Sequence, residues 1–259
     1  MLELTIAVFQ ADAADQDIET RLSHLARAAQ EAAASGAQIL VTPELYLSGY
    51  NIGDDITNRA IPSDGVIATR VSDIASKAGI AIIYGYPERT EKGIYNAAKV
   101  ISPTGDLANH RKQALPGAFE QSAFIPGNKF TRFQYMGWEV ALIICYEVEF
   151  PEIARAAAKD GAEILIVPTA LKAEWSFVAE KIVPTRAFEN GFFVVYANHA
   201  GTEGDFTYLG GSRIDGPDGT AHAVAGTDET LIFATINKED ILRARQKLPY
   251  LTDLPHLSA

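Results

Sequence analysis

The chain has 259 residues, 47% of them hydrophobic, which is enough to bury a substantial core, and we expect one domain over residues 1–259. The net charge of -11 argues against nucleic acid as a partner, because binding phosphates requires a basic surface. The single cysteine excludes an intrachain disulfide and fits a reducing compartment.

The N-terminus predicts a core strand over residues 2–10, without the basic lead or cleavage site of a signal peptide. No later run is long enough to span a bilayer, so we expect a cytoplasmic protein that contacts no membrane. The five histidines lie far apart, with no H-x-x-x-H or C-x-x-C spacing, and no metal site is visible. G-x-G-x-x-G and G-x-x-x-x-G-K-S/T are both absent, which argues against a nucleotide cofactor, and we predict no cofactor at all.

Strands and helices alternate along the first half of the chain. The patterns predict a helix over 17–35, a strand over 38–42, a helix over 64–79, a strand over 80–86, and a hairpin of strands 94–102 and 107–112. Glu44 follows Pro43 at the end of the second strand. The segment 45–55 contains Tyr50 and two glycines, and a loop of this kind can shape a pocket or simply connect elements at the surface.

The centre of the chain holds the run V-A-L-I-I-C-Y-E-V-E-F-P, residues 140–151. Before it, residues 116–127 predict a loop that contains Glu120, and residues 131–135 predict a strand. The apolar run predicts a buried strand that stops where Cys145 emerges, with a helix starting near Pro151. A thiol at such an elbow lies near helix N–H groups, which lower a thiol pKa. A free cysteine is nevertheless often an inert core residue.

The second half repeats part of the first. G-A-Q-I-L-V-T-P at 36–43 matches G-A-E-I-L-I-V-P at 161–168, and each copy follows an alanine-rich helix. Further elements are predicted as strands over 163–167, 192–198 and 231–236, helices over 174–189 and 238–247, and a tail over 248–259 that packs on the body or on a second subunit. Alternating strands and helices that also form hairpins predict an α/β sandwich.

Three polar residues stand where strands end: Glu44, Lys112 and Cys145. Each has an ordinary explanation, as a loop cap, a solvated lysine and a core thiol. Together they offer a base, a fixed positive charge and a nucleophile, which are the parts needed for acyl transfer through a covalent intermediate.

Four motifs carry a resemblance to a known family. They are P-E-L at Glu44, R-K-Q-A-L at Lys112, F-E-Q-S-A-F-I-P-G at Glu120 and I-C-Y-E-V-E-F-P-E at Cys145, and their order resembles the nitrilase superfamily of carbon–nitrogen hydrolases. The resemblance runs from Met1 to about Leu254. One departure is Glu147, where that family commonly has aspartate.

The resemblance implies a four-layer α-β-β-α sandwich of the nitrilase type, usually a homodimer, with a Glu-Lys-Cys triad. Cys145 would attack the substrate carbon, Glu44 would transfer protons, and Lys112 with the backbone N–H of Tyr146 would stabilise the oxyanion. Glu120 looks like the additional carboxylate of the amidases in this family.

The expected substrate is a small aliphatic primary amide. The chain looks most like bacterial aliphatic amidases, including those acting on ω-amino amides such as 5-aminopentanamide. Carboxylates that could receive an ammonium group are Asp54, Asp55, Glu147 and Glu174, and aromatic residues that could line the pocket are Tyr50, Tyr146 and Trp175. Alternatives of the same superfamily are a nitrilase and an N-carbamoyl hydrolase, and further alternatives are an amine-accepting acyltransferase and a non-catalytic binding protein.

Overall fold

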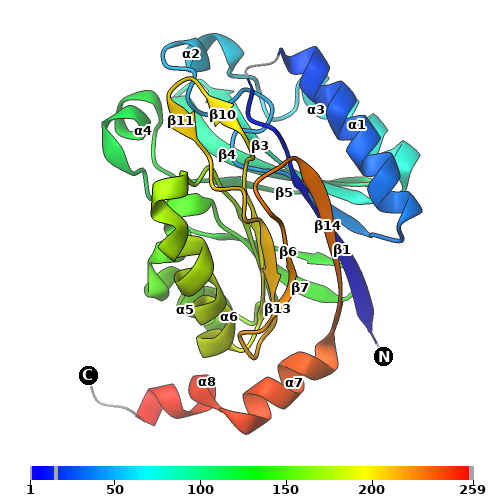
Figure 1. The fold of residues 1–259 in the computed structure, drawn as a ribbon, viewed down its shortest axis with the longest axis vertical. Helices are drawn as coiled ribbons and strands as arrows, with labels where there is room; N and C mark the ends of the chain where they lie inside the picture. The colour runs from blue at the N-terminus through cyan, green and yellow to red at the C-terminus, as the bar shows by residue number, and fades with distance from the viewer. Residues whose placement is uncertain (1, 15–16, 257–259) are drawn as a thin grey trace.

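A computed structural model describes residues 2–14 and 17–256, and its framework is two six-stranded sheets (Figure 1). The first sheet has the order β14-β1-β2-β3-β4-β5, with β1 (Glu3–Gln10), β2 (Ile39–Val41), β3 (Ala81–Thr90), β4 (Gly93–Ser102), β5 (Gly105–Arg111) and β14 (Thr230–Asn237). The second has the order β13-β12-β9-β8-β7-β6, with β6 (Thr131–Tyr135), β7 (Trp138–Leu142), β8 (Ile164–Pro168), β9 (Phe193–Ala197), β12 (Arg213–Asp215) and β13 (Ala221–Val224).

The two sheets have the same internal plan. In each, three adjacent strands run parallel, β1-β2-β3 in one and β7-β8-β9 in the other, and antiparallel strands flank them on both sides. β2 and β8 occupy equivalent central positions, and they contain the two copies of the repeated sequence. The pseudo-symmetry predicted from the sequence is therefore present in the fold.

Helices cover the outer face of each sheet. α1 (Ile18–Ala34) and α3 (Val66–Ala78) pack on the first sheet, and α5 (Pro151–Lys159) and α6 (Val183–Asn190) pack on the second (Figure 1). Alternation along the strands produces this arrangement, since Ile6 and Val8 face the second sheet while Ala7 and Phe9 face α1 and α3. The predicted four-layer α-β-β-α sandwich is confirmed.

Capping residues fix the ends of several helices. The Asp17 carboxylate accepts a hydrogen bond of 2.7 Å from Thr20 N at the start of α1. Gly191 ends α6 in the left-handed conformation, with a φ of 58°. Pro151 in the first turn of α5 occupies a position where its missing N–H costs no hydrogen bond.

Two predicted elements differ from the structure. Residues 116–127 are not a continuous loop, because α4 (Gly117–Ala123) lies within them and carries Glu120. The helix predicted over 174–189 is present as one helical run, but it begins with a 3₁₀ turn (Ala173–Trp175) and contains a π-helical turn (Val178–Ile182) before α6. Pro184 provides a reason, since it has no N–H for the regular hydrogen bond to the preceding turn.

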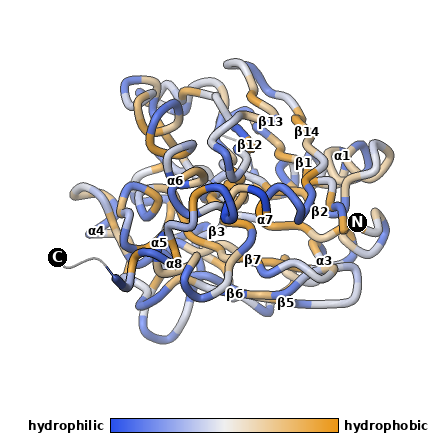
Figure 2. The backbone as a smooth tube through the Cα atoms, turned by 90° about the horizontal axis from the view of Figure 1, so that it is seen from below, coloured by the Kyte–Doolittle hydropathy of each residue, from blue (hydrophilic) through white to orange (hydrophobic). Residues whose placement is uncertain are grey.

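The remaining elements are shorter and lie at the edges. They are α2 (Asp55–Arg59), the hairpin β10 (Thr202–Glu203) and β11 (Phe206–Thr207), α7 (Lys238–Lys247), α8 (Tyr250–Asp253) and a 3₁₀ turn (Leu254–His256). Seen from below, α7 crosses under the two sheets and alternates hydrophilic with hydrophobic residues (Figure 2). Part of the predicted tail, residues 257–259, falls outside the described residues. Among the helices of the described chain, none is long and apolar enough to cross a membrane.

Candidate active site

The cysteine lies at the predicted elbow. β7 ends at Leu142, and Cys145 opens a 3₁₀ turn (Cys145–Glu149) that leads directly into α5 at Pro151. Cys145 has a φ of 51°, which is uncommon for a residue other than glycine. Backbone strain of this kind persists where the surrounding structure enforces it, often at functional sites. The elbow therefore holds the thiol in a conformation that the local sequence alone would not favour.

Glu44 follows β2 and is held from two sides. Its carbonyl oxygen lies 2.8 Å from Nε2 of the buried His199. Gly85 of β3 lies against the same segment, where a Cβ atom would come within 2.5 Å of the carbonyl oxygen of Pro43 and 2.4 Å of Leu45 N. Gly85 thus allows the chain to pass close enough to β3 to bury Glu44.

Lys112 joins two carboxylates in the interior. Its Nζ lies 2.7 Å from Glu44 Oε1 and 2.6 Å from Glu120 Oε1, and all three side chains are fully buried. Asn96 of β4 donates a second hydrogen bond, of 2.7 Å, to Glu44 Oε1. The Tyr50 hydroxyl donates one of the same length to Glu120 Oε1. The structure therefore brings Glu44, Lys112 and Glu120, which the sequence spreads over three motifs, into one hydrogen-bonded cluster.

Burial and mutual charge set the protonation of this cluster. Burial alone would lower the pKa of Lys112, but the charges of Glu44 and Glu120 more than offset it and raise that pKa. Burial raises the pKa of Glu120 to about 7, against the opposing effect of Lys112. The lysine is therefore a permanent cation, while one of its two carboxylate partners titrates near neutral pH.

The Cys145 thiol is neutral at rest, contrary to the expectation from the elbow. Burial, followed by the negative charge of Glu44, raises its pKa, and the effects of Lys112 and of a Thr169 hydrogen bond are smaller. Such a thiol needs a base before it can act as a nucleophile. Glu44 Oε2 is buried and has no hydrogen-bond partner in the described part of the chain, so one carboxylate oxygen is free to accept a proton.

A cavity of about 280 Å³ opens onto the thiol. Of the predicted site residues, Tyr50, Cys145, Tyr146 and Trp175 line it. This volume is at the small end for small-molecule sites, and the lining is mainly apolar. The cavity therefore suits a short acyl chain.

The cavity also has two charged residues that the sequence analysis did not single out. They are Glu149, at the end of the elbow, and Lys172, whose ammonium lies 3.2 Å from the centre of the Phe206 ring. Burial raises the pKa of Glu149, while Lys112 and Arg186 act in the opposite direction. Only the acidic residues of the C-Y-E-V-E motif offered a signal for Glu149, and no local pattern pointed to Lys172.

Glu147 corrects the sequence prediction, because it does not line the cavity. Its carboxylate is fully buried and lies 2.8 Å from His110 Nε2. It also accepts hydrogen bonds of 2.6 Å from Ile144 N and 3.1 Å from Gln113 N. A carboxylate with all these partners supports the elbow and is not available to a substrate.

The other predicted carboxylates also lie away from the cavity. Asp54, Asp55 and Glu174 are exposed and absent from its lining, and Asp55 is paired with Arg59 at 2.9 Å. They are therefore not placed to receive an ammonium group of a substrate bound at Cys145.

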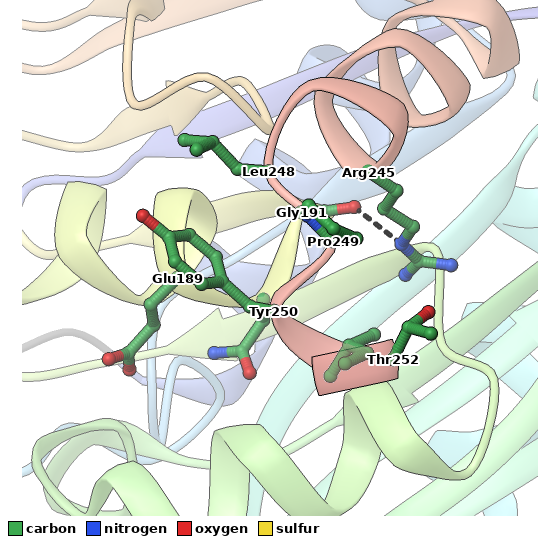
Figure 3. Close-up of a pocket in the computed structure, with 9 residues that line it drawn as sticks. Glu189, Gly191, Arg245, Leu248, Pro249, Tyr250 and Thr252 are labelled. Atoms are coloured by element: carbon green, nitrogen blue, oxygen red, sulfur yellow. Dashed lines mark hydrogen bonds between the residues drawn. The ribbon is translucent and has the colours of Figure 1, made fainter. Parts of the chain in front are cut away.

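A second, smaller cavity of about 50 Å³ lies where the C-terminal helices cross α6 (Figure 3). Arg245 donates a hydrogen bond of 3.0 Å to the carbonyl oxygen of Gly191 there, with Tyr250 and Glu189 nearby (Figure 3). Its lining contains neither Cys145 nor any of the buried carboxylates described above. It is a packing gap and not a reaction site.

Comparison with known proteins places this site in context. The family model described as carbon-nitrogen hydrolase matches residues 5–246. A Pseudomonas protegens protein named as a hydrolase in the pqqF 5′ region is 42% identical over 96% of this chain and 88% of its own. An (R)-stereoselective amidase of a Pseudomonas species is 32% identical over 85% of this chain and 80% of its own.

Solved structures of a nitrilase-superfamily amidase from Nesterenkonia sp. AN1 have the same fold. One, described as showing covalent addition of the acetamide moiety of fluoroacetamide at the active-site cysteine, has a TM-score of 0.85 and 33% identity over 96% of each chain. Another, a cysteine-to-alanine variant in complex with butyramide, has a TM-score of 0.84 and 33% identity over 95% of each chain.

Proposed function

Because this chain belongs to the carbon–nitrogen hydrolase family and is an amidase acting on bonds other than peptide bonds, we propose a specific reaction for it. The enzyme hydrolyses small aliphatic primary amides through a thioester on Cys145. The observation that carries the proposal is the neutral Cys145 thiol at the cavity, in the electrostatic field of the buried Glu44, Lys112 and Glu120. That arrangement supplies a nucleophile, a base and a fixed cation.

The first half-reaction forms the thioester. Glu44 accepts the thiol proton, and the Cys145 sulfur attacks the amide carbon. The oxyanion that develops is stabilised by Lys112 and the backbone N–H of Tyr146, each worth roughly a hundredfold or more in rate. Glu44 then passes its proton to the nitrogen, and ammonia leaves.

The second half-reaction releases the acid. Glu44 takes a proton from water, and the resulting hydroxide attacks the thioester carbon, so that the Cys145 sulfur leaves and is reprotonated. Glu120 holds Lys112 in place throughout, through the bond of 2.6 Å.

The test is ammonia release from 5-aminopentanamide, pentanamide and pentanenitrile, with Cys145→Ala run alongside. We expect release from the amides and none from the variant. Reaction of the nitrile alone would replace the proposal with a nitrilase, and formation of a substituted amide in the presence of added amine would indicate an acyltransferase.

The finer proposal is an ω-amino amide, and Glu149 is its support. Glu149 is an acidic group in the lining of the cavity, and within the described residues its carboxylate makes no hydrogen bond. A distal ammonium group on the acyl chain would pair with it. We expect Glu149→Gln to lower the preference for 5-aminopentanamide over pentanamide by about tenfold while leaving pentanamide turnover near the wild-type level.

Lys172 favours a second candidate, the monoamide of a dicarboxylic acid. Its ammonium lies at the cavity and has no carboxylate partner among the ion pairs of the described chain. If Lys172→Met weakens the binding of such a monoamide and Glu149→Gln leaves 5-aminopentanamide unaffected, this candidate replaces the ω-amino amide.

We also propose that the enzyme works in the cytoplasm as a homodimer. Phe177, Phe188 and Tyr250 are exposed aromatic residues on the α6 and α8 side of the molecule, with 66%, 40% and 39% of their surface accessible. A second copy would bury them. Light scattering should give twice the chain mass for the wild type and a lower mass for Phe177→Glu.

A further inference from the structure

One buried carboxylate outside the Glu44–Lys112–Glu120 cluster connects two walls of the active-site cavity. Glu203, at the end of β10, is 3% exposed. Tyr50 N lies 3.1 Å from each of its carboxylate oxygens, and Asn51 N lies 2.6 Å from Oε2. The Tyr208 hydroxyl donates a further hydrogen bond of 2.7 Å to Oε2. Backbone N–H groups that converge on a carboxylate form strong, charge-assisted hydrogen bonds.

The loop fits closely around this carboxylate. Gly49 has a φ of 89°, and a Cβ atom on it would lie 2.3 Å from Glu203 Oε1. Asn51 Nδ2 also donates a hydrogen bond of 2.9 Å to the Glu203 carbonyl oxygen. Residues 49–51 are therefore held against β10 by their backbone as well as by a side chain.

The residue so fixed, Tyr50, reaches the cluster. Its hydroxyl donates to Glu120 Oε1, the same oxygen that accepts from Lys112. Phe206, on the other strand of the hairpin, has its ring centre 6.2 Å from that of Tyr50, and both rings line the cavity. Glu203 is thus connected to Lys112 through hydrogen bonds that pass by way of Tyr50 and Glu120. Through Tyr50 it also contacts the apolar wall of the cavity.

We propose that Glu203 is a positioning residue for amide hydrolysis, which holds residues 49–51 so that the Tyr50 hydroxyl stays bonded to Glu120 and the Tyr50–Phe206 wall keeps its shape. The inference rests on the proposed function. Loss of the carboxylate would free the loop, remove a donor from Glu120 and loosen the cavity, so that kcat falls and KM rises together.

A pH readout distinguishes this role from general stabilisation. The groups facing Glu120 are Lys112, Glu44 and Tyr50, and the Tyr50 hydrogen bond is one of the effects that lower the Glu120 pKa. When that donor moves away, the pKa of Glu120 rises. The acid limb of kcat/KM should therefore move to higher pH in Glu203→Gln, by roughly half a unit or more.

The test is a double-mutant cycle of Glu203→Gln and Tyr50→Phe, measured as kcat/KM for pentanamide. If Glu203 acts through the Tyr50 hydroxyl, Glu203→Gln costs about tenfold in the wild type and less than about threefold in Tyr50→Phe. Equal losses in the two backgrounds, or an unmoved acid limb, would overturn the inference. Wild-type turnover that is abolished in Cys145→Ala tests the proposed function separately, so the two failures are distinguishable.

Two further variants control for folding. Glu163 provides a matched carboxylate, since it accepts a hydrogen bond of 2.9 Å from Glu139 N and pairs with Lys238 away from the cavity. Glu163→Gln should lower stability without moving the acid limb, and a comparable shift in it would count against the inference. If Glu203→Gln does not fold, Tyr208→Phe is used instead, because it removes one hydrogen-bond donor from Glu203. We expect Tyr208→Phe to lower kcat/KM less than Glu203→Gln would. For the inference to hold, the loss caused by Tyr208→Phe must be smaller in the Tyr50→Phe background than in the wild type.

Discussion

Glu147 joins the two segments that carry the nucleophile and the cation. One of its oxygens accepts from Ile144 N, next to Cys145, and the other from Gln113 N, next to Lys112. Burial would raise the pKa of Glu147, but the charge of His110 and the hydrogen bonds it accepts lower it overall. The longer glutamate side chain therefore serves as an internal brace between the elbow and the end of β5.

Removing this brace should cost stability as well as activity. We expect Glu147→Ala to lower the free energy of unfolding by about 2–4 kcal/mol, because it leaves the buried His110 and two backbone N–H groups without their acceptor. Urea unfolding measures the loss. Glu174→Ala, on an exposed glutamate, should change stability by less than about 0.5 kcal/mol, and a similar value for the two variants would contradict the role assigned to Glu147.

Residue types and order were enough to predict the cluster, but not the surroundings of the cavity. Glu44, Lys112, Glu120 and Cys145 stand in recognisable motifs, and the structure brings the first three within hydrogen-bonding distance. Lys172 lies directly before the 3₁₀ turn that starts at Ala173, and no periodicity in the sequence indicates that it lines the cavity. Glu147 was placed with the substrate because its distant partner His110 could not be identified from spacing.

At the scale of elements, the ends of strands decide where the reacting groups lie. Glu44 follows β2, Lys112 follows β5 and Cys145 follows β7, so both sheets contribute to one site. Boundaries were predicted to within one residue for β4, which is an almost continuously buried strand, and for β6, which alternates along its length. The prediction failed over 116–127, where α4 was missed. A helix of seven residues that is flanked by proline and glycine has little periodic signal.

Gly85 shows how closely β3 must approach the segment that carries Glu44. Gly85→Ala would place a Cβ atom within 2.5 Å of the carbonyl oxygen of Pro43, and the segment would have to move. We expect kcat to fall by more than about tenfold, because small displacements of a base are costly. Gly226→Ala is the matched control, with no atom within 4 Å of the added Cβ, and steady-state kinetics on both variants should separate them. Unchanged kcat in Gly85→Ala would contradict this account.

The C-terminal helices are tied to the second helical layer by Arg245. Its guanidinium donates hydrogen bonds of 3.0 Å to the carbonyl oxygens of Gly191 and of Ala162 (the former drawn in Figure 3). Arg245→Ala should lower the free energy of unfolding by about 1–3 kcal/mol, or Tm by several degrees, with little change in kcat. Differential scanning calorimetry measures this, and the exposed Arg243→Ala serves as control. A large fall in kcat with an unchanged Tm would be inconsistent with a purely packing role.

For the whole molecule, the buried cluster makes stability depend on pH. In the folded chain Glu120 keeps its proton up to a pKa of about 7, whereas its ordinary value is 4.5. The folded state therefore binds more protons between these two pH values, and the free energy of unfolding falls as the pH rises through this window. Such a cluster is maintained at the expense of stability, as is common for functional sites.

Glu120→Gln should remove this dependence. Between pH 5 and pH 7, we expect the free energy of unfolding to fall more in the wild type than in the variant, by about 2 kcal/mol. Urea unfolding at the two pH values measures the difference. Glu174→Gln should behave like the wild type, and an identical fall in Glu120→Gln would show that Glu120 does not titrate in this window.

The pairing of β1 with β14 bears on how the chain is made. β1 leaves the ribosome more than 200 residues before its neighbour β14, as the pairing of Glu3 with Asn237 shows. Until β14 has been synthesised, the first sheet has an open edge at β1, and contacts this distant in sequence form slowly. A nascent chain would thus carry its cysteine before the sheet that positions the base is complete. Amidase activity should appear only after β14 has been synthesised and paired with β1.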